Sequence, residues 1–266
     1  MGRTVTGATG EPVRQRRASR APSPLFVGLV LASVVSGWAL WTGYGNAGLF
    51  AFVFVACAWV VSLCLHEFAH ALVAYRGGDH SVVEKGYLTL DPLKYTHFVY
   101  SIVLPLLFVL LGGIGLPGGA VFIDRRFLRS RLSNSLVSLA GPLTNVVFAA
   151  VLAVALSAYG VSDGEHVEFW AAVAFLTFLQ VTAAVLNSLP VPGLDGFGVI
   201  QPYLSNKILR QVAPIAPYAV LLLFVLLWIP PINQAFFSIV LWFLDLLGVP
   251  EGLTGYGQQL FRFWLG

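Results

Sequence analysis

Long apolar runs alternate with short polar links along almost the whole chain. The runs cover residues 25–41, 47–75, 98–115, 136–159, 169–189, 214–229 and 232–247. Most of them approach the length of about 20 residues that an α-helix needs to cross the hydrocarbon core of a bilayer. The pattern predicts an all-α polytopic membrane protein with about six transmembrane helices.

The run at 98–115 is expected to behave differently from the others. Basic residues flank it on both sides, with Lys85 and Lys94 before it and the cluster at 125–131 after it. Basic loops favour the cytoplasmic side, so one full crossing would place one flank wrongly. Pro105 and the glycine pair at 112–113 also interrupt the run. We therefore expect a re-entrant segment that dips into the membrane and returns.

Two shorter segments show extended rather than helical patterns. Residues 79–97 alternate weakly and predict an extended or hairpin segment at the membrane interface. Residues 116–123 form a short, β-prone strip after a glycine-rich turn. Non-helical backbone at membrane depth is tolerated only where it is buried in protein or lines a cavity. The strip is therefore expected to be a small membrane-embedded β segment beside a cavity.

Composition supports the membrane assignment. The chain of 266 residues is 58% hydrophobic and 10% charged, with a mean hydropathy of +0.82, whereas soluble domains carry about 25% charged residues. Residues 1–24 are rich in Gly, Thr, Pro and Arg and predict a disordered basic tail. Residues 251–266 are expected to lie as a tail on the surface.

Charge placement predicts the orientation. Basic residues cluster at 14–20, 76–94, 125–131 and 207–210, whereas acidic residues cluster at 163–168. The positive-inside rule places the basic loops and the N-terminus in the cytoplasm. These short clusters beside membrane spans do not indicate nucleic-acid binding. Cys57 and Cys64 lie seven residues apart on one helix, where a disulfide cannot close.

Three ionisable side chains stand inside the apolar run at 47–75. An ionisable residue in a membrane span indicates a functional site by default, because burying it is costly. His66 and His70 are four residues apart, on one face of a helix, so both imidazoles can bind one ion. Glu67 can reach a metal-bound water without being a ligand itself. The alternatives are a chance match or histidines that hydrogen-bond within the bundle.

A catalytic zinc ion needs three protein ligands and one open position. Asp195 is the best third candidate, because it follows a proline-rich turn at the expected cytoplasmic end of a returning helix. An Asp-Gly pair is by itself a common turn signal. Asp91, Glu84 and Asp245 are alternatives that the spacing leaves open.

Three segments together resemble a known family. His66-Glu67-Phe68-Ala69-His70, residues 141–145 (Gly-Pro-Leu-Thr-Asn) and residues 187–196, which end in Leu-Asp-Gly, resemble the signature segments of the site-2 protease family of intramembrane zinc metalloproteases. The resemblance implies that His66, His70 and Asp195 bind one Zn²⁺ ion and that Glu67 is the catalytic acid and base. It implies a transmembrane metalloprotease domain over 25–250 with its core at 47–200.

The resemblance is to a compact bacterial-type member of that family. The link at 160–168 leaves no room for a PDZ domain. The resemblance implies an integral protein of a prokaryotic cell membrane, with the active site towards the cytoplasmic side. The sequence gives no indication of the oligomeric state.

The family implies hydrolysis of peptide bonds in or near transmembrane segments of membrane-protein substrates within the lipid bilayer. Pro117, Gly118 and Gly119 resemble a strand that lies near the active site in this family, and Val121 continues it. An unwound substrate could pair with this strip by strand addition. Asn145 and Asn187 carry amides that could hold the substrate backbone, or that could simply pack the spans.

Two other functions fit the same residues. A protein of this family that has lost activity could act as a membrane scaffold or chaperone, although the intact His66, Glu67, His70 and Asp195 argue against it. A zinc transporter also places histidines and acids in membrane helices. A transporter would spread them along a path, whereas here they cluster towards one face.

Overall fold

The computed structural model describes residues 21–95, 121–160 and 164–265. These residues form helices, turns and loops, and no strand occurs among them. The longer helices are α1 (Pro24–Thr42), α2 (Ala47–Gly77), α5 (Arg131–Ala155), α6 (Val167–Asn187), α9 (Ala216–Leu227), α10 (Pro230–Leu246) and α11 (Glu251–Phe261). The shorter ones are α3 (Ser81–Glu84), η1 (Tyr87–Thr89), η3 (Arg125–Phe127), η4 (Leu156–Gly160), α7 (Asp195–Ile200), η5 (Gln201–Tyr203), α8 (Asn206–Val212) and η6 (Phe263–Leu265).

The first two spans are bounded by local sequence signals. Ser23 caps α1 by accepting a hydrogen bond from the Phe26 amide, and Asn46 caps α2 in the same way at Leu49. Polar caps of this kind satisfy amides that have no partner within the helix. Gly43 and Gly78 end the two helices in left-handed backbone conformations, which glycine adopts without a steric penalty.

Four predicted spans are confirmed as single helices long and apolar enough to cross a membrane. They are α1, α2, α5 with its continuation in η4, and α6. The chain beyond α7 contains two bent pairs, α8 with α9 at 64° and α10 with α11 at 115°. Because α9 has only 12 residues, it is about 18 Å long and cannot cross a bilayer alone. The described residues therefore contain four to six candidate spans, and the expected count of about six is not supported as an exact number.

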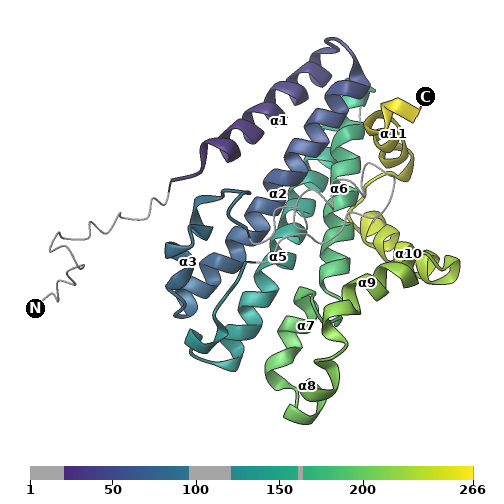
Figure 1. Ribbon diagram of the computed structural model, residues 1–266. Helices are drawn as coiled ribbons and strands as arrows, with labels where there is room; N and C mark the ends of the chain where they lie inside the picture. Colours follow the sequence, from purple (N-terminus) through teal and green to yellow (C-terminus); the bar gives the residue numbers. More distant parts are fainter. Residues whose placement is uncertain (1–20, 96–120, 161–163, 266) are drawn as a thin grey trace, which may run out of the picture.

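Helix α6 lies at the centre of the bundle, between α2, α5 and α11 (Figure 1). It is the most buried of the four straight spans. Ala171, Ala172 and Ala174 on α6 are fully buried. Small residues of this kind let neighbouring backbones approach closely in a membrane. The close packing fixes α6 relative to α2 and α5, which carry the polar groups described below.

Two predicted extended segments differ from the structure. Residues 79–95 form α3, η1 and a turn, and Tyr87, Leu88 and Thr89 are all buried, which excludes the alternating exposure of an interfacial strand. Of the predicted strip, residues 116–120 lie outside the described residues, as does the predicted re-entrant run at 98–115. Val121 to Asp124 are neither helix nor strand. A membrane-embedded β strip is therefore not supported.

The C-terminal segment also differs from the expected surface tail. Residues 251–261 form α11, which packs against α6 and α2, and Phe261 is fully buried. Phe263 contacts Gly48, so this end of the chain lies beside the link between α1 and α2 (Figure 1). At the N-terminus, residues 1–20 of the predicted tail lie outside the described residues, and the Ser23 amide is bonded to the Thr89 carbonyl.

Candidate active site

Three buried ionisable residues project from the middle of α2. His66, Glu67 and His70 are 5%, 1% and 6% exposed. His66 lies 11 residues before the last residue of α2, Gly77, a distance of about 16 Å along the helix. The polar site therefore lies well inside the apolar span, where polar groups need defined partners.

Asp195 reaches the two histidines from a different part of the chain. The sequence from Leu189 to Leu194 turns after α6, with two backbone hydrogen bonds inside the turn. Asp195 is the first residue of α7, which follows this turn. A Cβ at Gly196 would collide with the Ser188 and Leu189 carbonyls, so glycine lets α7 lie against the end of α6. This close approach brings the Asp195 carboxylate to α2.

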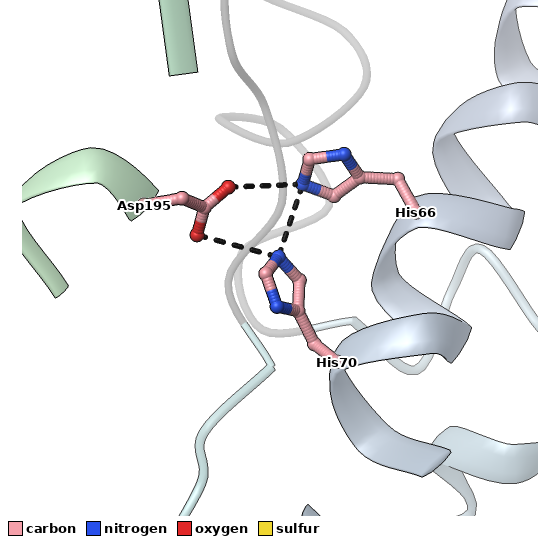
Figure 2. Close-up of side chains that lie close together, drawn as sticks. All are labelled: His66, His70 and Asp195. Carbon is pink, nitrogen blue, oxygen red and sulfur yellow. Dashed lines mark hydrogen bonds and ion pairs between the residues drawn. The ribbon is translucent and has the colours of Figure 1, made fainter. Parts of the chain in front are cut away.

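The three side chains converge on one point (Figure 2). The Nε2 atoms of His66 and His70 are 3.1 Å apart. Asp195 places Oδ2 3.2 Å from Nε2 of His66 and Oδ1 3.3 Å from Nε2 of His70. The side chain of Asp195 is 22% exposed, compared with 6% and 8% for the two histidines. The site is therefore most open on the Asp195 side.

Hydrogen bonds fix which nitrogen of each imidazole faces this point. Nδ1 of His66 lies 2.6 Å from Oδ1 of Asn145, and Nδ1 of His70 lies 2.6 Å from the carbonyl oxygen of Val137. A backbone carbonyl oxygen can only accept a hydrogen bond, so Nδ1 of His70 carries a proton. The amide oxygen of Asn145 also only accepts, so Nδ1 of His66 carries a proton as well. Each neutral imidazole then presents the lone pair of Nε2 towards Asp195.

With both imidazoles neutral, two nitrogen lone pairs and a carboxylate face one another, and a cation between them would stabilise this arrangement. Zinc bound tetrahedrally by nitrogen and oxygen at about 2.0–2.1 Å separates its ligand atoms by about 3.3 Å. The two Nε2 atoms, 3.1 Å apart, are close to that separation, and each of them has a different oxygen of Asp195 at 3.2 or 3.3 Å. With one ligand atom from each residue, all three atoms lie within 4.8 Å of one another. The site thus fits a zinc ion held by His66, His70 and Asp195.

The helix opposite the histidines leaves space for an ion. A Cβ at Gly141 of α5 would contact Nε2 of both His66 and His70. Pro142 follows at once, inside α5, and lacks the N–H that would bond to the Ser138 carbonyl. Glycine is therefore required here because any side chain would enter the space between the ligands.

Glu67 lies beside the three converging side chains and is not one of them. Its Oε2 accepts a 3.1 Å hydrogen bond from the Val121 amide. A carboxylate next to a metal site, but outside the ligand set, is the arrangement that a general base requires. The residues on this side of α2 are therefore of the types that a hydrolytic zinc centre needs.

Relatives of the chain carry names that agree with this geometry. The chain is 47% identical over 257 residues to "Putative zinc metalloprotease Rip2" of Mycolicibacterium smegmatis, covering 95% of this chain and 98% of that protein. It is 46% identical over 255 residues to the Rip2 protein of Mycobacterium tuberculosis, covering 94% and 96%. It is 31% identical over 195 residues to "Putative zinc metalloprotease YwhC" of Bacillus subtilis, covering 69% and 81%.

The chain belongs to this family of zinc metalloproteases. The resemblance stated for its three motifs is confirmed to that extent. No family model matches the sequence, and no solved structure matches it either.

The metalloprotease brings only some of the sequence-predicted residues to the site. Among the described residues, His66, His70 and Asp195 are the one group of three or more His, Cys, Asp or Glu side chains that could hold a metal ion. The alternative ligands Glu84, Asp91 and Asp245 lie outside it, and Asp91 instead accepts from the Leu93 amide in a turn.

The side chains of Asn145 and Asn187 differ in their hydrogen bonds. Asn145 uses its Oδ1 for His66 and donates from Nδ2 to Oε1 of Gln180 at 3.3 Å. Asn187 is the last residue of α6 and is 6% exposed. Its amide makes no hydrogen bond to any described residue. The Asn187 amide is therefore uncommitted among the described residues, whereas both ends of the Asn145 amide are hydrogen-bonded.

Of the remaining substrate-binding candidates, the structure describes Val121 alone. Pro117, Gly118 and Gly119 lie outside the described residues. Val121 is half-buried and bonded to Glu67. The N–H of Ile123, two residues further on, has no hydrogen bond within the part of the chain that the structure describes.

Sequence reasoning missed the residue that holds this segment in place. Asp79 is fully buried, and its Oδ2 accepts a 2.8 Å hydrogen bond from the Asp124 amide. Its Oδ1 accepts from both the amide and the hydroxyl of Ser81. The hydrogen bonds from Arg126 hold the pKa of Asp124 at about 2. An acid directly after the glycine pair that ends α2 is the signal that could have indicated Asp79.

Proposed function

We propose that the protein is an intramembrane zinc metalloprotease that hydrolyses peptide bonds in or near transmembrane segments of membrane proteins. The observation that carries the proposal is the position of Glu67. It is 1% exposed within a helix long enough to span a membrane, directly beside three converging metal-ligand side chains. A carboxylate buried in a span without a chemical task would be costly to maintain.

Each residue of the site has a separate role in the proposed hydrolysis. When bound, a zinc ion would lower the pKa of a water molecule and polarise the scissile carbonyl. Glu67 takes the proton of that water and later donates it to the leaving amine. The Val121 amide holds Oε2 of Glu67, which leaves Oε1 for the proton. His66, His70 and Asp195 would hold the ion as three protein ligands, the number that a catalytic zinc site uses.

The segment from Val121 to Ile123 is our proposed contact for the substrate backbone. A transmembrane helix must unwind to expose a peptide bond, and its freed N–H and C=O groups then need partners. The N–H of Ile123 is unpaired among the described residues and lies two positions after the amide that holds Glu67. Strand addition at this point would bring an extended peptide beside the catalytic carboxylate. Asn187 offers a further, unoccupied amide.

We propose that the site faces the cytoplasmic side of a prokaryotic cell membrane. The Arg129 amide bonds to the Gly77 carbonyl, so the basic cluster before α5 lies beside the end of α2 that carries Arg76. Figure 1 shows α7 and α8, the latter with Lys207 and Arg210, towards this same end. Clustering of basic residues at one end supports a cytoplasmic location for it and for the N-terminus.

Other functions receive less support from the site. A zinc transporter needs ionisable groups along a path across the membrane, whereas one metal-binding group occurs in the part of the chain that is described. A scaffold without activity has no use for Glu67. A buried acid and a complete ligand set therefore favour the protease.

The proposal is tested with purified protein in liposomes and a transmembrane peptide substrate. Wild-type protein is expected to contain about one zinc ion per chain and to cleave the peptide. Glu67→Gln keeps the shape of the side chain and loses the proton acceptor, so it should keep zinc and lose cleavage by several orders of magnitude. Glu84→Gln, at an exposed glutamate of α3, is the matched control and should behave as wild type.

Two results would contradict the proposal. Cleavage by Glu67→Gln at a tenth of the wild-type rate or more would remove Glu67 from the mechanism. A zinc-loaded wild-type protein that cleaves no transmembrane peptide would favour the scaffold.

A further inference from the structure

A chain of buried polar side chains runs from the zinc site into the centre of the bundle. Oδ1 of Asn145 faces Nδ1 of His66 at 2.6 Å, and Nδ2 of Asn145 donates to Oε1 of Gln180 at 3.3 Å. Nε2 of Gln180 donates to the hydroxyl of Ser62 at 2.8 Å, and that hydroxyl donates to the Trp59 carbonyl, also at 2.8 Å. Asn145, Gln180 and Ser62 are all at least 95% buried.

The order of donors and acceptors along this chain matters to the metal. An amide side chain has one donor end and one acceptor end, and rotation by half a turn exchanges them. In the observed order, Oδ1 of Asn145 accepts a hydrogen bond from Nδ1 of His66. The imidazole proton is then on Nδ1, and Nε2 is free to bind metal. In the reverse order, the Asn145 amide nitrogen would face Nδ1, and the proton would move to Nε2 and block coordination.

Gln180 is the residue that selects between the two orders. It presents the acceptor Oε1 to Asn145 and so keeps the Asn145 nitrogen turned away from His66. Gln180 itself is fully buried in α6, and its own orientation is set by donation to Ser62. An amide at this depth in a membrane span needs hydrogen-bond partners for both its oxygen and its nitrogen. The oxygen of Gln180 accepts from Asn145, and its nitrogen donates to Ser62.

We propose that Gln180 is a positioning residue that holds His66, through Asn145, in the tautomer that binds the metal. The inference rests on the proposed zinc site and adds to it the part of the bundle that maintains it. The side-chain hydrogen bonds of Gln180 go to Asn145 and Ser62, and none of them goes to His66, His70 or Asp195. Residues that orient a metal-binding histidine typically change metal affinity by 10–100-fold when they are replaced.

The test compares two substitutions by the affinity of the protein for Zn²⁺, measured by competition with a chelator. Gln180→Met fills nearly the same volume and removes the acceptor, so affinity should fall about tenfold. Gln180→Glu keeps an acceptor for Asn145 in either protonation state, so affinity should remain close to wild type. A role in packing alone predicts the opposite order, because methionine suits an apolar bundle and a buried glutamate does not.

A double variant that also carries Asn145→Asp keeps the test decisive if Gln180→Met is poorly folded. Asn145→Asp places two acceptor oxygens beside His66, and a carboxylate has no wrong orientation. In this background Gln180→Met should no longer weaken zinc binding, which is a coupling that a double-mutant cycle measures directly. Persistence of the full loss in the Asn145→Asp background would overturn the proposal.

Thr177→Val is the matched control on the same helix. Thr177 is fully buried on α6 and bonds only to the Val173 carbonyl of its own helix, so its replacement should leave zinc affinity unchanged. The outcomes separate the two proposals. Failure of the wild-type protein to bind zinc would overturn the zinc site itself. Tight binding by wild type and equally tight binding by Gln180→Met would overturn only the role of Gln180.

Discussion

The amide of Val121 donates a 3.1 Å hydrogen bond to Oε2 of Glu67, across 54 positions of sequence. The bond joins the segment proposed to contact the substrate to the carboxylate proposed to act as the base. The Asp124 amide is bonded in turn to the buried Asp79, so the segment is held at both ends. A substrate that pairs with this backbone would therefore lie at a fixed position relative to Glu67.

Val121→Pro tests this connection. Proline has no N–H, so the variant removes one hydrogen bond to a carboxylate, worth about 1.5–3 kcal/mol. We expect cleavage of a transmembrane peptide to fall at least tenfold through kcat, with zinc content unchanged, because no ligand is touched. Rate measurements together with metal analysis check this.

Ile123→Pro is the companion variant, because it removes an N–H that has no partner among the described residues. If the substrate backbone pairs at this position, KM for the transmembrane peptide should rise while kcat stays near wild type. Normal kinetics in a folded, zinc-loaded Ile123→Pro protein would show that the substrate binds elsewhere.

The apolar pattern was sufficient to predict the four straight spans, because their length and hydropathy are set by the bilayer. For α2, the expected bounds of 47–75 compare with an observed helix over Ala47–Gly77. The pattern failed at 79–95 and 251–261, where short helical turns and α11 pack against the bundle. Burial there depends on neighbours distant in sequence, which periodicity does not encode.

At the candidate site, too, the sequence predicted the residues but not the contacts that orient them. The spacing of His66 and His70 and the turn before Asp195 indicated three residues whose possible ligand atoms lie within 4.8 Å of one another in the structure. The contacts that orient them could not be read in the same way. A lone glutamine in an apolar run signals a buried polar contact, but only packing of α2, α5 and α6 shows that Gln180 meets Asn145.

Asp195→Ala is expected to lower zinc occupancy, because it removes one of three protein ligands and the only carboxylate among them. Asp91→Ala, Glu84→Ala and Asp245→Ala should retain wild-type occupancy, since all three lie outside the described metal-binding group. Metal analysis of the four purified variants decides between them. Unchanged occupancy in Asp195→Ala would remove it from the ligand set.

Phe261→Ala tests whether α11 is part of the folded bundle. Phe261 is fully buried, and its ring lies 5.4 Å from that of Phe175 and 5.3 Å from that of Phe52. Truncating a buried phenylalanine typically costs about 3–5 kcal/mol, so the unfolding temperature in detergent should fall clearly. Leu265→Ala, at an exposed position, is the control and should leave it unchanged. Equal unfolding temperatures for both variants would mean that α11 is a detachable tail.

Gly141→Ala tests the space for the metal while leaving all three ligands in place. The added methyl group would contact Nε2 of both His66 and His70, and neither histidine can retreat without breaking its hydrogen bond to Asn145 or Val137. Zinc content is expected to fall to less than a tenth of wild type although every ligand remains. Gly28→Ala makes the same change in α1, where nothing lies within 4 Å, and should bind zinc normally. If Gly141→Ala binds zinc as tightly as wild type, the ion must lie away from the point where His66, His70 and Asp195 converge.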